Sequence, residues 1–513
     1  MKSHLLKFVR IVLAILSIIV ITLLFVDFTG WSAAMLSFMA DIQFVPALLA
    51  INIVALIFLA LITLIFGRLY CSVICPLGIS QDVIAWLRRC FTPHRKRKAG
   101  IYRYEKENKV LRYIFLSIFL LLAVLGLASL LPISVAGILD PYSAYGRIVG
   151  QTIVPACHYY ATVMGLRQAS VGNYIFDSAP QLSGHINIAI AIVAAITFIV
   201  VAAFAITSGR GYCNKICPVG TILGFLSRYS LLKPVIYTDK CNRCGSCSRH
   251  CKAQCIDSKS HAIDYSRCVV CLDCINSCKQ GALSYRRAPK VTVIKEESHI
   301  DNTRRNFLIG GATIAGSFVA SAASGKILDG GLTPLKDKQS HKDISPTLPA
   351  GAISHSHFRS HCTACQLCVN ECPEHILRPV ITLEGFMQPT MSFTESFCRT
   401  ECVRCSQVCP TGAITPIDEA LKTSIKIGTA HVDATICLSA TEGVDCGNCQ
   451  RHCPVDAISM IDDKNGHKRP VVNEGACIGC GSCEYHCPVG NIEQYAANHA
   501  AIYVEGLKQH QSI

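Results

Sequence analysis

The sequence predicts a membrane α-helical bundle joined to two small cysteine-rich α+β modules. Three observations predict this fold class: four long apolar segments in the first 234 residues, a total of 31 cysteines, and the regular spacing of most of those cysteines. Only 16% of the 513 residues are charged. That share is low for a soluble protein and is typical of a protein partly embedded in a membrane.

Four segments of the membrane domain, residues 1–234, are long enough to cross a bilayer, which requires about 20 apolar residues. They lie at residues 9–28, 44–66, 113–134 and 185–208. Lysine and arginine gather before the first span and in the 67–112 loop, whereas the two outward loops hold only Arg147 and Arg167. The positive-inside rule therefore places the N-terminus, the 67–112 loop and the region after Gly209 in the cytoplasm. We expect a multi-pass protein of the bacterial inner (cytoplasmic) membrane.

The formal net charge of +14 raises the question of nucleic-acid binding. The largest basic cluster flanks an apolar span, however, and no nucleic-acid-binding motif occurs. The cysteines could form disulfides or bind metal. Disulfide frameworks occur in short secreted chains with variable spacing, whereas these cysteines repeat as C-x2-C-x2-C-x3-C. We therefore expect metal binding and no nucleic-acid partner.

An internal repeat lies at the cytoplasmic ends of the second and fourth spans. Residues 67–78, GRLYCSVICPLG, match residues 209–220, GRGYCNKICPVG, around a C-x3-C-P core. Because proline cannot continue a regular helix freely, each motif is expected to mark a helix end or kink. Four thiols brought together could bind one cluster or metal ion, act as redox thiols, or be ordinary buried cysteines; we favour the first reading. The thiols belong to Cys71, Cys75, Cys213 and Cys217.

The segment 135–184 is predicted to be the longer outer loop. Asp140, His158, Tyr159 and Tyr160 could line a quinol pocket there, because quinol oxidation needs a proton acceptor near the hydroxyls. Asp140 and His158 are therefore weak catalytic candidates, and for each residue an ordinary loop position is the simpler explanation. The sequence has no C-x2-C-H haem-attachment motif.

Residues 235–290 form the first cysteine-rich module, predicted to be a cytoplasmic two-cluster ferredoxin module. Its spacing is typical of [4Fe–4S] binding, in which three close thiolates hold one cluster and the fourth cysteine binds the neighbouring cluster. We assign Cys241, Cys244, Cys247 and Cys278 to one cluster, and Cys268, Cys271, Cys274 and Cys251 to the other. Lys252 and Lys279 stand where proline usually follows the fourth cysteine. The extra Cys255 is interpreted as a small apolar core residue.

Residues 301–325 are predicted to be a signal-anchor-like helix, the fifth crossing of the membrane. Arg304 and Arg305 precede an uncharged run, and Thr303 to Leu308 resembles a twin-arginine export signal. An ordinary fifth span is the alternative, and both readings place the residues after 325 in the periplasm. We expect no cleavage near Ala322. Residues 326–360, rich in Gly, Ser, Pro, His and Lys, are predicted to be a flexible linker.

Residues 361–500 carry four more cysteine sets and are predicted to be a periplasmic four-cluster polyferredoxin module. The sets are Cys362, Cys365, Cys368 and Cys372; Cys398, Cys402, Cys405 and Cys409; Cys437, Cys446, Cys449 and Cys453; and Cys477, Cys480, Cys483 and Cys487. Sixteen cysteines in this pattern predict four [4Fe–4S] clusters. Two pairings of the fourth ligands remain open: neighbouring sets exchange them, or the outer and inner sets pair.

These motifs resemble two known families. Residues 1–290 resemble the NapH-type membrane ferredoxin, and residues 301–500 resemble the NapG/MauM-type periplasmic polyferredoxin, so the chain looks like a fusion of the two. The resemblance implies α+β ferredoxin-like polyferredoxin modules and a quinol dehydrogenase drawing on the quinone pool. It also implies a periplasmic oxidoreductase or cytochrome acceptor, typically nitrate reductase.

The expected cofactors are six [4Fe–4S] clusters, with a seventh if the C-x3-C-P cysteines hold one, and the expected substrate is quinol. Two alternatives remain: a redox chaperone or maturation factor for a periplasmic metalloenzyme, and a membrane redox sensor. One difficulty faces the relay hypothesis. The two modules are expected on opposite sides of about 30 Å of hydrocarbon, so either quinol shuttles between the sides or a partner bridges the gap.

Overall fold

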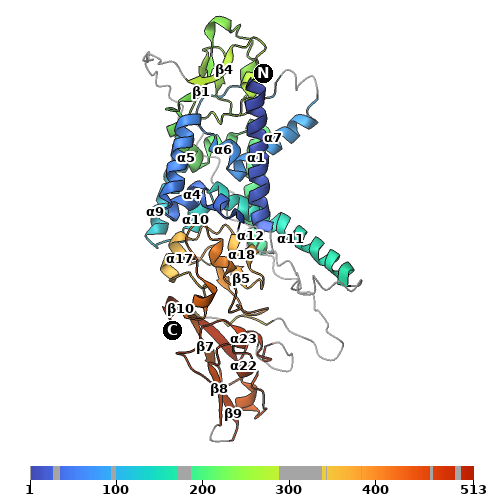
Figure 1. The fold of residues 1–513 in the computed structure, drawn as a ribbon, viewed down its shortest axis with the longest axis vertical. Coiled ribbons are helices and arrows are strands. Elements are labelled where there is room, and N and C mark those ends of the chain that lie inside the picture. Colours follow the sequence, from blue (N-terminus) through green and yellow to red (C-terminus); the bar gives the residue numbers. More distant parts are fainter. Residues whose placement is uncertain are drawn as a thin grey trace, which may run out of the picture.

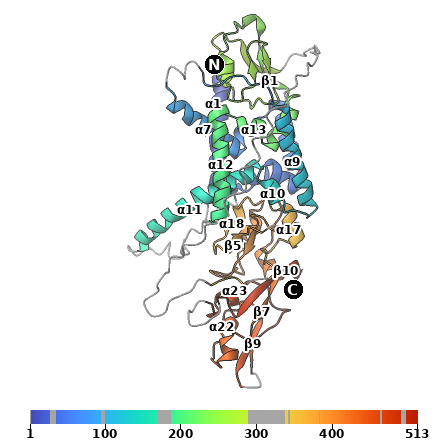
Figure 2. The same cartoon turned by 180° about the vertical axis from the view of Figure 1, so that it is seen from behind.

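The computed structural model describes residues 2–26, 35–93, 100–169, 187–287, 338–341, 344–382, 384–462, 466–490 and 498–513. It shows an elongated molecule with helices in the middle and one cysteine-rich module at each end (Figure 1). The view from behind shows the same stacking (Figure 2). We refer to residues 232–287 as the first module and to residues 338–513 as the second module. The predicted signal-anchor helix at 301–325 lies outside the described residues.

Three of the described helices are long and apolar enough to cross a membrane. They are α1 (Lys2–Val26), whose apolar part begins at Leu5, α9 (Lys109–Leu127) and α12 (Ile188–Ser208). Each coincides with a predicted span. Most of their apolar side chains are exposed on the protein surface, as expected for helices that face lipid rather than a protein core.

The second predicted span, residues 44–66, is not one helix, so the prediction of four continuous spans is wrong there. It consists of α4 (Phe44–Leu49) and α5 (Ile53–Phe66). The break lies at Ile51, which has a positive φ of 52°. The side chain of Asn52 then accepts a hydrogen bond from the backbone N–H of Ala55 at 3.1 Å and starts α5 as its N-cap.

The described part of the predicted outer loop at 135–184, which ends at residue 169, is largely helical, so the prediction of a loop is wrong for that part. It contains α10 (Ser134–Gly137) and the 29-residue α11 (Pro141–Ala169). The Asp140 carboxylate accepts hydrogen bonds from the backbone N–H and the hydroxyl of Ser143 at 2.9 and 2.6 Å. These contacts satisfy donors of the first turn of α11, as an N-cap does.

Shorter helices connect the spans and form the centre of the helical layer. They are α3 (Phe38–Asp41), α6 (Tyr70–Val73), α7 (Pro76–Phe91), α13 (Gly211–Lys215) and α14 (Pro218–Ser227). Of these, α6 with α7 and α13 with α14 carry the two copies of the sequence repeat.

The first module is a small α+β unit. Its strands pair antiparallel, β1 (Leu232–Ile236) with β4 (Leu283–Arg287) and β2 (Ile256–Asp257) with β3 (Ala262–Ile263). The connections carry η2 (Thr238–Lys240), α15 (Ser246–Arg249) and α16 (Asp273–Ser277). Such short elements leave most of the chain in cysteine-bearing loops.

The second module repeats this construction. Its antiparallel pairs are β5 (Leu377–Pro379) with β6 (Pro389–Met391), β8 (Ile458–Asp462) with β9 (Lys468–Val472), and β7 (Ile425–Val432) with β10 (Ile502–Ser512). Its helices are α17 (His355–His361), α18 (Leu367–Glu371), α19 (Arg404–Gln407), α20 (Glu419–Lys422), α21 (Leu438–Thr441), α22 (Asn448–Arg451) and α23 (Ser482–Tyr485). The strand β10 extends the module beyond the predicted end at residue 500.

Part of the segment predicted as a flexible linker, residues 326–360, is packed against the second module, so the prediction is wrong for that part. The Lys338 ammonium donates hydrogen bonds to the carbonyls of Glu484, Tyr485 and Cys487 at 2.8 to 2.9 Å. Leu348 and Ala352 are buried. A few apolar side chains between the glycines and serines are enough to fix this segment, because each buries its surface in the module core.

Candidate iron–sulfur sites

In the first module, the cysteines gather into the two groups that the spacing predicts. A cavity of about 340 Å³ is lined by Cys268, Cys271 and Cys274 of one set and by Cys251 of the other. Cys247 lies within electrostatic reach of Cys241, Cys244 and Cys278. Each group therefore takes three cysteines from one set and one from its neighbour, the arrangement of a two-cluster ferredoxin.

In the second module, neighbouring sets exchange their fourth cysteines, which answers the question left open by the sequence. Three cavities of about 340, 480 and 370 Å³ are lined by Cys362, Cys365, Cys368 and Cys409; by Cys372, Cys398, Cys402 and Cys405; and by Cys437, Cys446, Cys449 and Cys487. The Cys480 thiol interacts electrostatically with those of Cys453 and Cys477. The Cys483 thiol interacts in the same way with those of Cys477 and Cys480. The remaining four cysteines thus form the fourth group.

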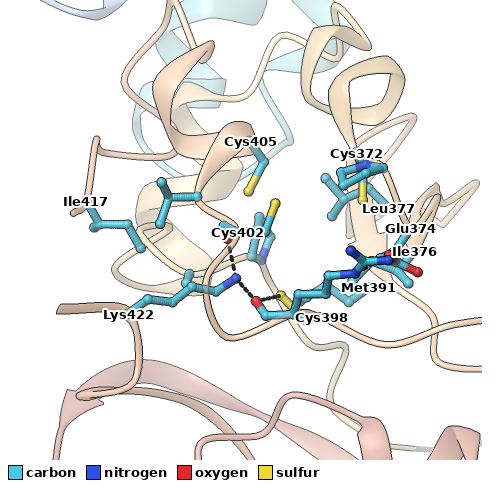
Figure 3. Close-up of a pocket in the computed structure, with 15 residues that line it drawn as sticks. Cys372, Glu374, Ile376, Leu377, Met391, Cys398, Cys402, Cys405, Ile417 and Lys422 are labelled. Atoms are coloured by element: carbon cyan, nitrogen blue, oxygen red, sulfur yellow. Dashed lines mark hydrogen bonds and ion pairs between the residues drawn. The ribbon is translucent and has the colours of Figure 1, made fainter. Parts of the chain in front are cut away.

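Figure 3 shows the largest of these cavities. The sulfur atoms of Cys372, Cys398, Cys402 and Cys405 border the same space, with Lys422 of α20 at its edge. The Lys422 ammonium is buried and donates hydrogen bonds to the backbone carbonyls of Arg399 and Cys402. This places a positive charge beside the thiols, where it offsets the negative charge of bound thiolates.

The buried thiols of the second module need metal to lose their protons. Burial raises the pKa of Cys372 to about 11 and that of Cys480 to about 12, because an isolated thiolate is poorly solvated there. Metal binding supplies the compensating charge and releases the protons. The donor set therefore fits a thiolate-ligated group.

The spacing of the thiols fits a polynuclear cluster better than a single ion. In the described part of the chain, no three His, Cys, Asp or Glu side chains converge closely enough to hold one metal ion. A tetrahedral zinc ion holds its sulfur ligands at about 2.3 Å and so draws them to one point. Here four cysteines surround a cavity instead.

The four C-x3-C-P cysteines also come together, at a place between the two modules that we call the membrane thiol site. Cys71, Cys75, Cys213 and Cys217 are all buried, at 3 to 4% exposure. Cys75 lies within electrostatic reach of the other three. The amide of Gln81 donates a hydrogen bond to the Cys213 sulfur at 3.1 Å.

Two arginines cross between the repeats and hold the membrane thiol site together. Arg68 of the first repeat donates to the Cys213 carbonyl at 3.2 Å, and Arg210 of the second donates to the Cys71 carbonyl at 2.6 Å. Each also approaches a thiol sulfur, at 3.8 and 3.9 Å respectively. Both guanidinium groups are fully buried, so they place two positive charges beside four thiols.

The glycine that closes each repeat makes room for this crossing. A Cβ atom on Gly78 would lie 2.3 Å from the Cys71 carbonyl and 2.8 Å from Arg210, and one on Gly220 would lie 2.2 Å from the Cys213 carbonyl and 2.7 Å from Arg68. Sequence reasoning missed both arginines. The signal was present, because the repeat keeps Arg and Gly at matching positions outside the cysteine core.

Two helix N-termini also face the membrane thiol site. Cys75 is the N-cap of α7 and Cys217 is the N-cap of α14, with Pro76 and Pro218 in the first turns. The prediction that each proline marks a helix boundary is confirmed. The positive end of a helix dipole stabilises nearby negative charge, so both helices favour thiolates at this site.

The first module docks directly on the membrane thiol site. The Lys252 carbonyl accepts a hydrogen bond from the Arg210 backbone N–H at 2.8 Å, and its ammonium lies 2.8 Å from Asp82. Asp82 also binds the Arg210 side chain at 2.7 Å. Lys252 stands where proline is usual, and its positive charge attaches the first module to Asp82 of α7.

The second module docks on the opposite side, against α10 and α11. The Ser143 hydroxyl hydrogen-bonds to that of Thr363 at 2.9 Å, and Arg147 donates to the Ala364 carbonyl at 3.4 Å. A Cβ on Gly146 would lie 2.4 Å from the Cys365 carbonyl. This glycine therefore lets α11 touch the backbone of a cysteine-bearing loop.

Together these contacts arrange seven groups of four cysteines in a row along the molecule. From the first module to the far end of the second they are Cys241, Cys244, Cys247 and Cys278; Cys251, Cys268, Cys271 and Cys274; Cys71, Cys75, Cys213 and Cys217; Cys362, Cys365, Cys368 and Cys409; Cys372, Cys398, Cys402 and Cys405; Cys453, Cys477, Cys480 and Cys483; and Cys437, Cys446, Cys449 and Cys487. A hydrogen bond from the Cys398 N–H to the Cys480 carbonyl at 2.9 Å joins the fifth and sixth groups.

The two quinol-site candidates do not come together. Asp140 and His158 stand 18 residues apart at the start of and along the helix α11, which separates them by about 27 Å at a rise of 1.5 Å per residue. The Asp140 carboxylate is also engaged by Ser143. The helix thus sets the two backbone positions apart; the side chain of His158 lies outside the described residues, and both residues stay weak quinol-site candidates.

Comparison with known protein families places iron–sulfur binding in both parts of the chain. A family model described as "4Fe-4S binding domain" matches residues 48–98 and 190–236, and one described as "4Fe-4S dicluster domain" matches residues 444–491. The first match contains both C-x3-C-P motifs. No solved structure matches the chain.

Similar proteins are ferredoxin-type proteins of bacteria. NapH of Escherichia coli is 29% identical over 45% of this chain and 66% of its own length, and MauN of Paracoccus denitrificans is 26% identical over 44% and 57%. MauM of Methylobacillus flagellatus is 35% identical over 19% and 43%. The chain is therefore similar, at moderate identity over about half its length, to ferredoxin-type proteins of the NapH and MauN kind, and it combines 4Fe–4S domains with three described helices that are long and apolar enough to cross a membrane.

Proposed function

We propose that this protein oxidises quinol and relays the electrons through [4Fe–4S] clusters to a periplasmic reductase such as nitrate reductase. The first module would lie in the cytoplasm and the second in the periplasm, as the lysine and arginine distribution predicts. The choice of quinol and reductase rests on the resemblance to the NapH and NapG types. The proposal that the cysteine groups relay electrons rests on where these groups lie in the structure.

The observation that supports the relay best is the position of the membrane thiol site. It touches the first module through Arg210 and Lys252, and it approaches the second through Arg147, which interacts electrostatically with both Tyr212 and Cys365. Tyr212 is the neighbour of Cys213 in the chain. A seventh group of four cysteines thus occupies the gap that made crossing of the membrane difficult to explain.

A cluster at each group would supply a one-electron carrier. The residues around the membrane thiol site would stabilise the negative charge of a thiolate-bound cluster away from water, where an unpaired charge is costly. Arg68, Arg210 and the two helix N-termini supply positive charge. On this proposal, electrons would pass between the two modules along this row of sites without quinol or a partner as carrier.

The proposal is tested with the purified full-length protein in liposomes, given a menaquinol analogue. We expect electron paramagnetic resonance to show reduction of the clusters of the second module. The Cys71→Ser/Cys213→Ser variant is expected to lose this reduction, whereas Cys90→Ser, a change at an exposed cysteine, is expected to keep it. Second-module clusters that stay oxidised in the wild-type protein would contradict the relay.

A maturation factor would behave differently in a deletion strain. If the protein is a relay, its reductase stays fully active when an artificial electron donor is supplied. Persistent inactivity of the reductase with such a donor would favour the redox chaperone instead.

A further inference from the structure

We propose that the free end of the first module is a second electron-entry surface, which binds a small acidic electron-carrier protein. The inference rests on the relay proposed above and adds an electron source other than quinol. We call the surface formed by Lys240, Arg243 and Lys279 the basic surface.

The cysteine group at this end opens to solvent. Among the 25 cysteines of the two modules, Cys244 is the only exposed one. It belongs to the group farther from the membrane thiol site, because the other group of the module is the one that contacts the repeat through Lys252. A protein carrier needs such an exposed edge to approach a buried redox group closely.

Exposed positive charges surround this opening. Lys240, Arg243 and Lys279 directly adjoin Cys241, Cys244 and Cys278 in the chain, and all three are exposed. None of them takes part in an ion pair within the described residues. The Lys240 ammonium and the Arg286 guanidinium both lie over the Tyr237 ring, 5.9 and 4.4 Å from its centre. The charges are therefore available to an acidic partner.

The two modules differ in the sign of their charge. Residues 235–287 contain nine lysines and arginines against four aspartates, whereas residues 338–513 contain thirteen lysines and arginines against eighteen aspartates and glutamates. Long-range attraction raises the association rate of oppositely charged proteins and disfavours wrong partners. An acidic carrier would thus be drawn to the first module and repelled from the second.

An anionic lipid surface is the other occupant that positive charge could attract. The geometry favours the protein carrier, because the basic surface adjoins the cysteine group that lies on the side of the module away from the membrane thiol site. Lipid headgroups would instead be met near the helices, where Tyr285 hydrogen-bonds to the Phe66 carbonyl at 2.8 Å.

The test uses the full-length protein in nanodiscs of phosphatidylcholine, mixed rapidly with a chemically reduced acidic [2Fe–2S] ferredoxin. The test variant is Lys240→Glu/Arg243→Glu/Lys279→Glu. The matched control is Arg103→Glu/Lys106→Glu/Lys109→Glu, which makes the same charge change at exposed residues on the same side of the helices. At low salt we expect the rate of first-module reduction to fall about tenfold or more in the test variant and to change less than about twofold in the control. Reduced methyl viologen, a small cation, should reduce the first-module clusters of all three proteins, which checks that those clusters are intact.

Each other outcome is informative. Equal rates in the test variant and the wild type, or a wild-type rate independent of salt, would overturn the inference. A test variant that loses binding to phosphatidylserine vesicles but keeps its rate with ferredoxin would assign the basic surface to lipid. First-module reduction that depends on the basic surface but never reaches the second module would uphold this inference and defeat the relay.

Discussion

The first and second modules arrange their cysteines in the same way, with three from one set and one from its neighbour in each group, but they attach to the membrane domain differently. The first module is held by ion pairs as well as by close backbone contact: Lys252 binds Asp82 at 2.8 Å, Lys7 of α1 binds Asp273 at 2.6 Å, and a Cβ on Gly209 would lie 2.6 Å from the Lys252 carbonyl. The second is held by close backbone contact, in which Gly137 and Gly146 approach the carbonyls of Thr363 and Cys365. The attachment of the first module therefore combines ion pairs with close packing, whereas that of the second depends on close packing and hydrogen bonds. The predictions below test this difference, from the largest expected effect to the smallest.

Replacing Gly146 by leucine should separate the second module from α11. Even a Cβ atom would lie 2.4 Å from the Cys365 carbonyl and 2.7 Å from the Phe25 ring, so the module must move. Since a misplacement of about 1 Å costs about a hundredfold in rate in enzyme active sites, we expect reduction of the second-module clusters by way of the first module to slow by about that factor. Gly475→Ala, at an exposed site with only one neighbour, at 3.4 Å, serves as the control. An unchanged rate in Gly146→Leu would show that the glycine contact is not needed.

Replacing Lys252 by methionine should loosen the first module. The change keeps the volume but leaves Asp82 and Asp273 with one cation fewer. Since Asp82 keeps Arg210 and Asp273 keeps Lys7, the cost should be smaller than the roughly 3–5 kcal/mol of a buried charge left unpaired. We expect a lower thermal unfolding temperature and faster hydrogen exchange in residues 250–275. The exposed Lys259→Met should change neither measurement. If Lys252→Met matches the wild type, charge does not hold the module.

Cys255 should change the reduction potential of the cluster held by the cysteine group nearest the membrane domain. Its sulfur lies 3.6 Å from that of Cys251 and lines the same cavity, so it is more than the small apolar residue that the sequence predicts. A thiol that donates to a ligand sulfur raises the reduction potential of a cluster. We expect Cys255→Ala to shift the potential of this cluster to a more negative value in a redox titration. Cys255→Ser, which keeps a donor, should restore most of the shift; equal potentials in all three proteins would assign Cys255 to packing alone.

The smallest effect concerns pH and the C-terminal strand β10. Burial and the neighbouring His355 lower the pKa of His510 to about 4, and burial also lowers the pKa of His355. Between pH 6.5 and 4 the unfolded chain therefore binds more protons than the folded one, so stability is complete above about pH 6.5 and falls as the pH drops. The protection of the β10 amides against hydrogen exchange, corrected for the slower intrinsic exchange in acid, should be lower at pH 5 than at pH 7.5. His510→Gln should reduce this pH dependence; an equal dependence in the variant would place its origin elsewhere.

The local cysteine chemistry could be predicted from the sequence, because ligand spacing within a loop is a short-range property. The exchange of Cys251 and Cys278 between groups follows from it, and the structure brings those residues together accordingly. For the four C-x3-C-P cysteines, the repeat leaves open whether they bind a cluster or metal ion, act as redox thiols or are ordinary buried cysteines; the structure brings them together.

The remaining features were missed for two different reasons: some depend on local helix caps with a weak sequence signal, and others on contacts between distant segments. The break at Ile51 within an otherwise apolar run is fixed by the Asn52 cap, and the helix α11 begins at a carboxylate that was read as a quinol ligand. The crossing of Arg68 and Arg210 requires the two repeats to face each other. No periodicity within either repeat reveals that arrangement.

The central claim is that electrons pass between the modules through the membrane thiol site. The most direct test measures electron transfer across sealed liposomes that contain the protein, with dithionite outside and ferricyanide trapped inside. We predict that wild-type protein reduces the trapped ferricyanide and that Cys71→Ser/Cys213→Ser slows this to the rate of protein-free liposomes. A double variant as fast as the wild type, with its six other cysteine groups loaded, would contradict the account.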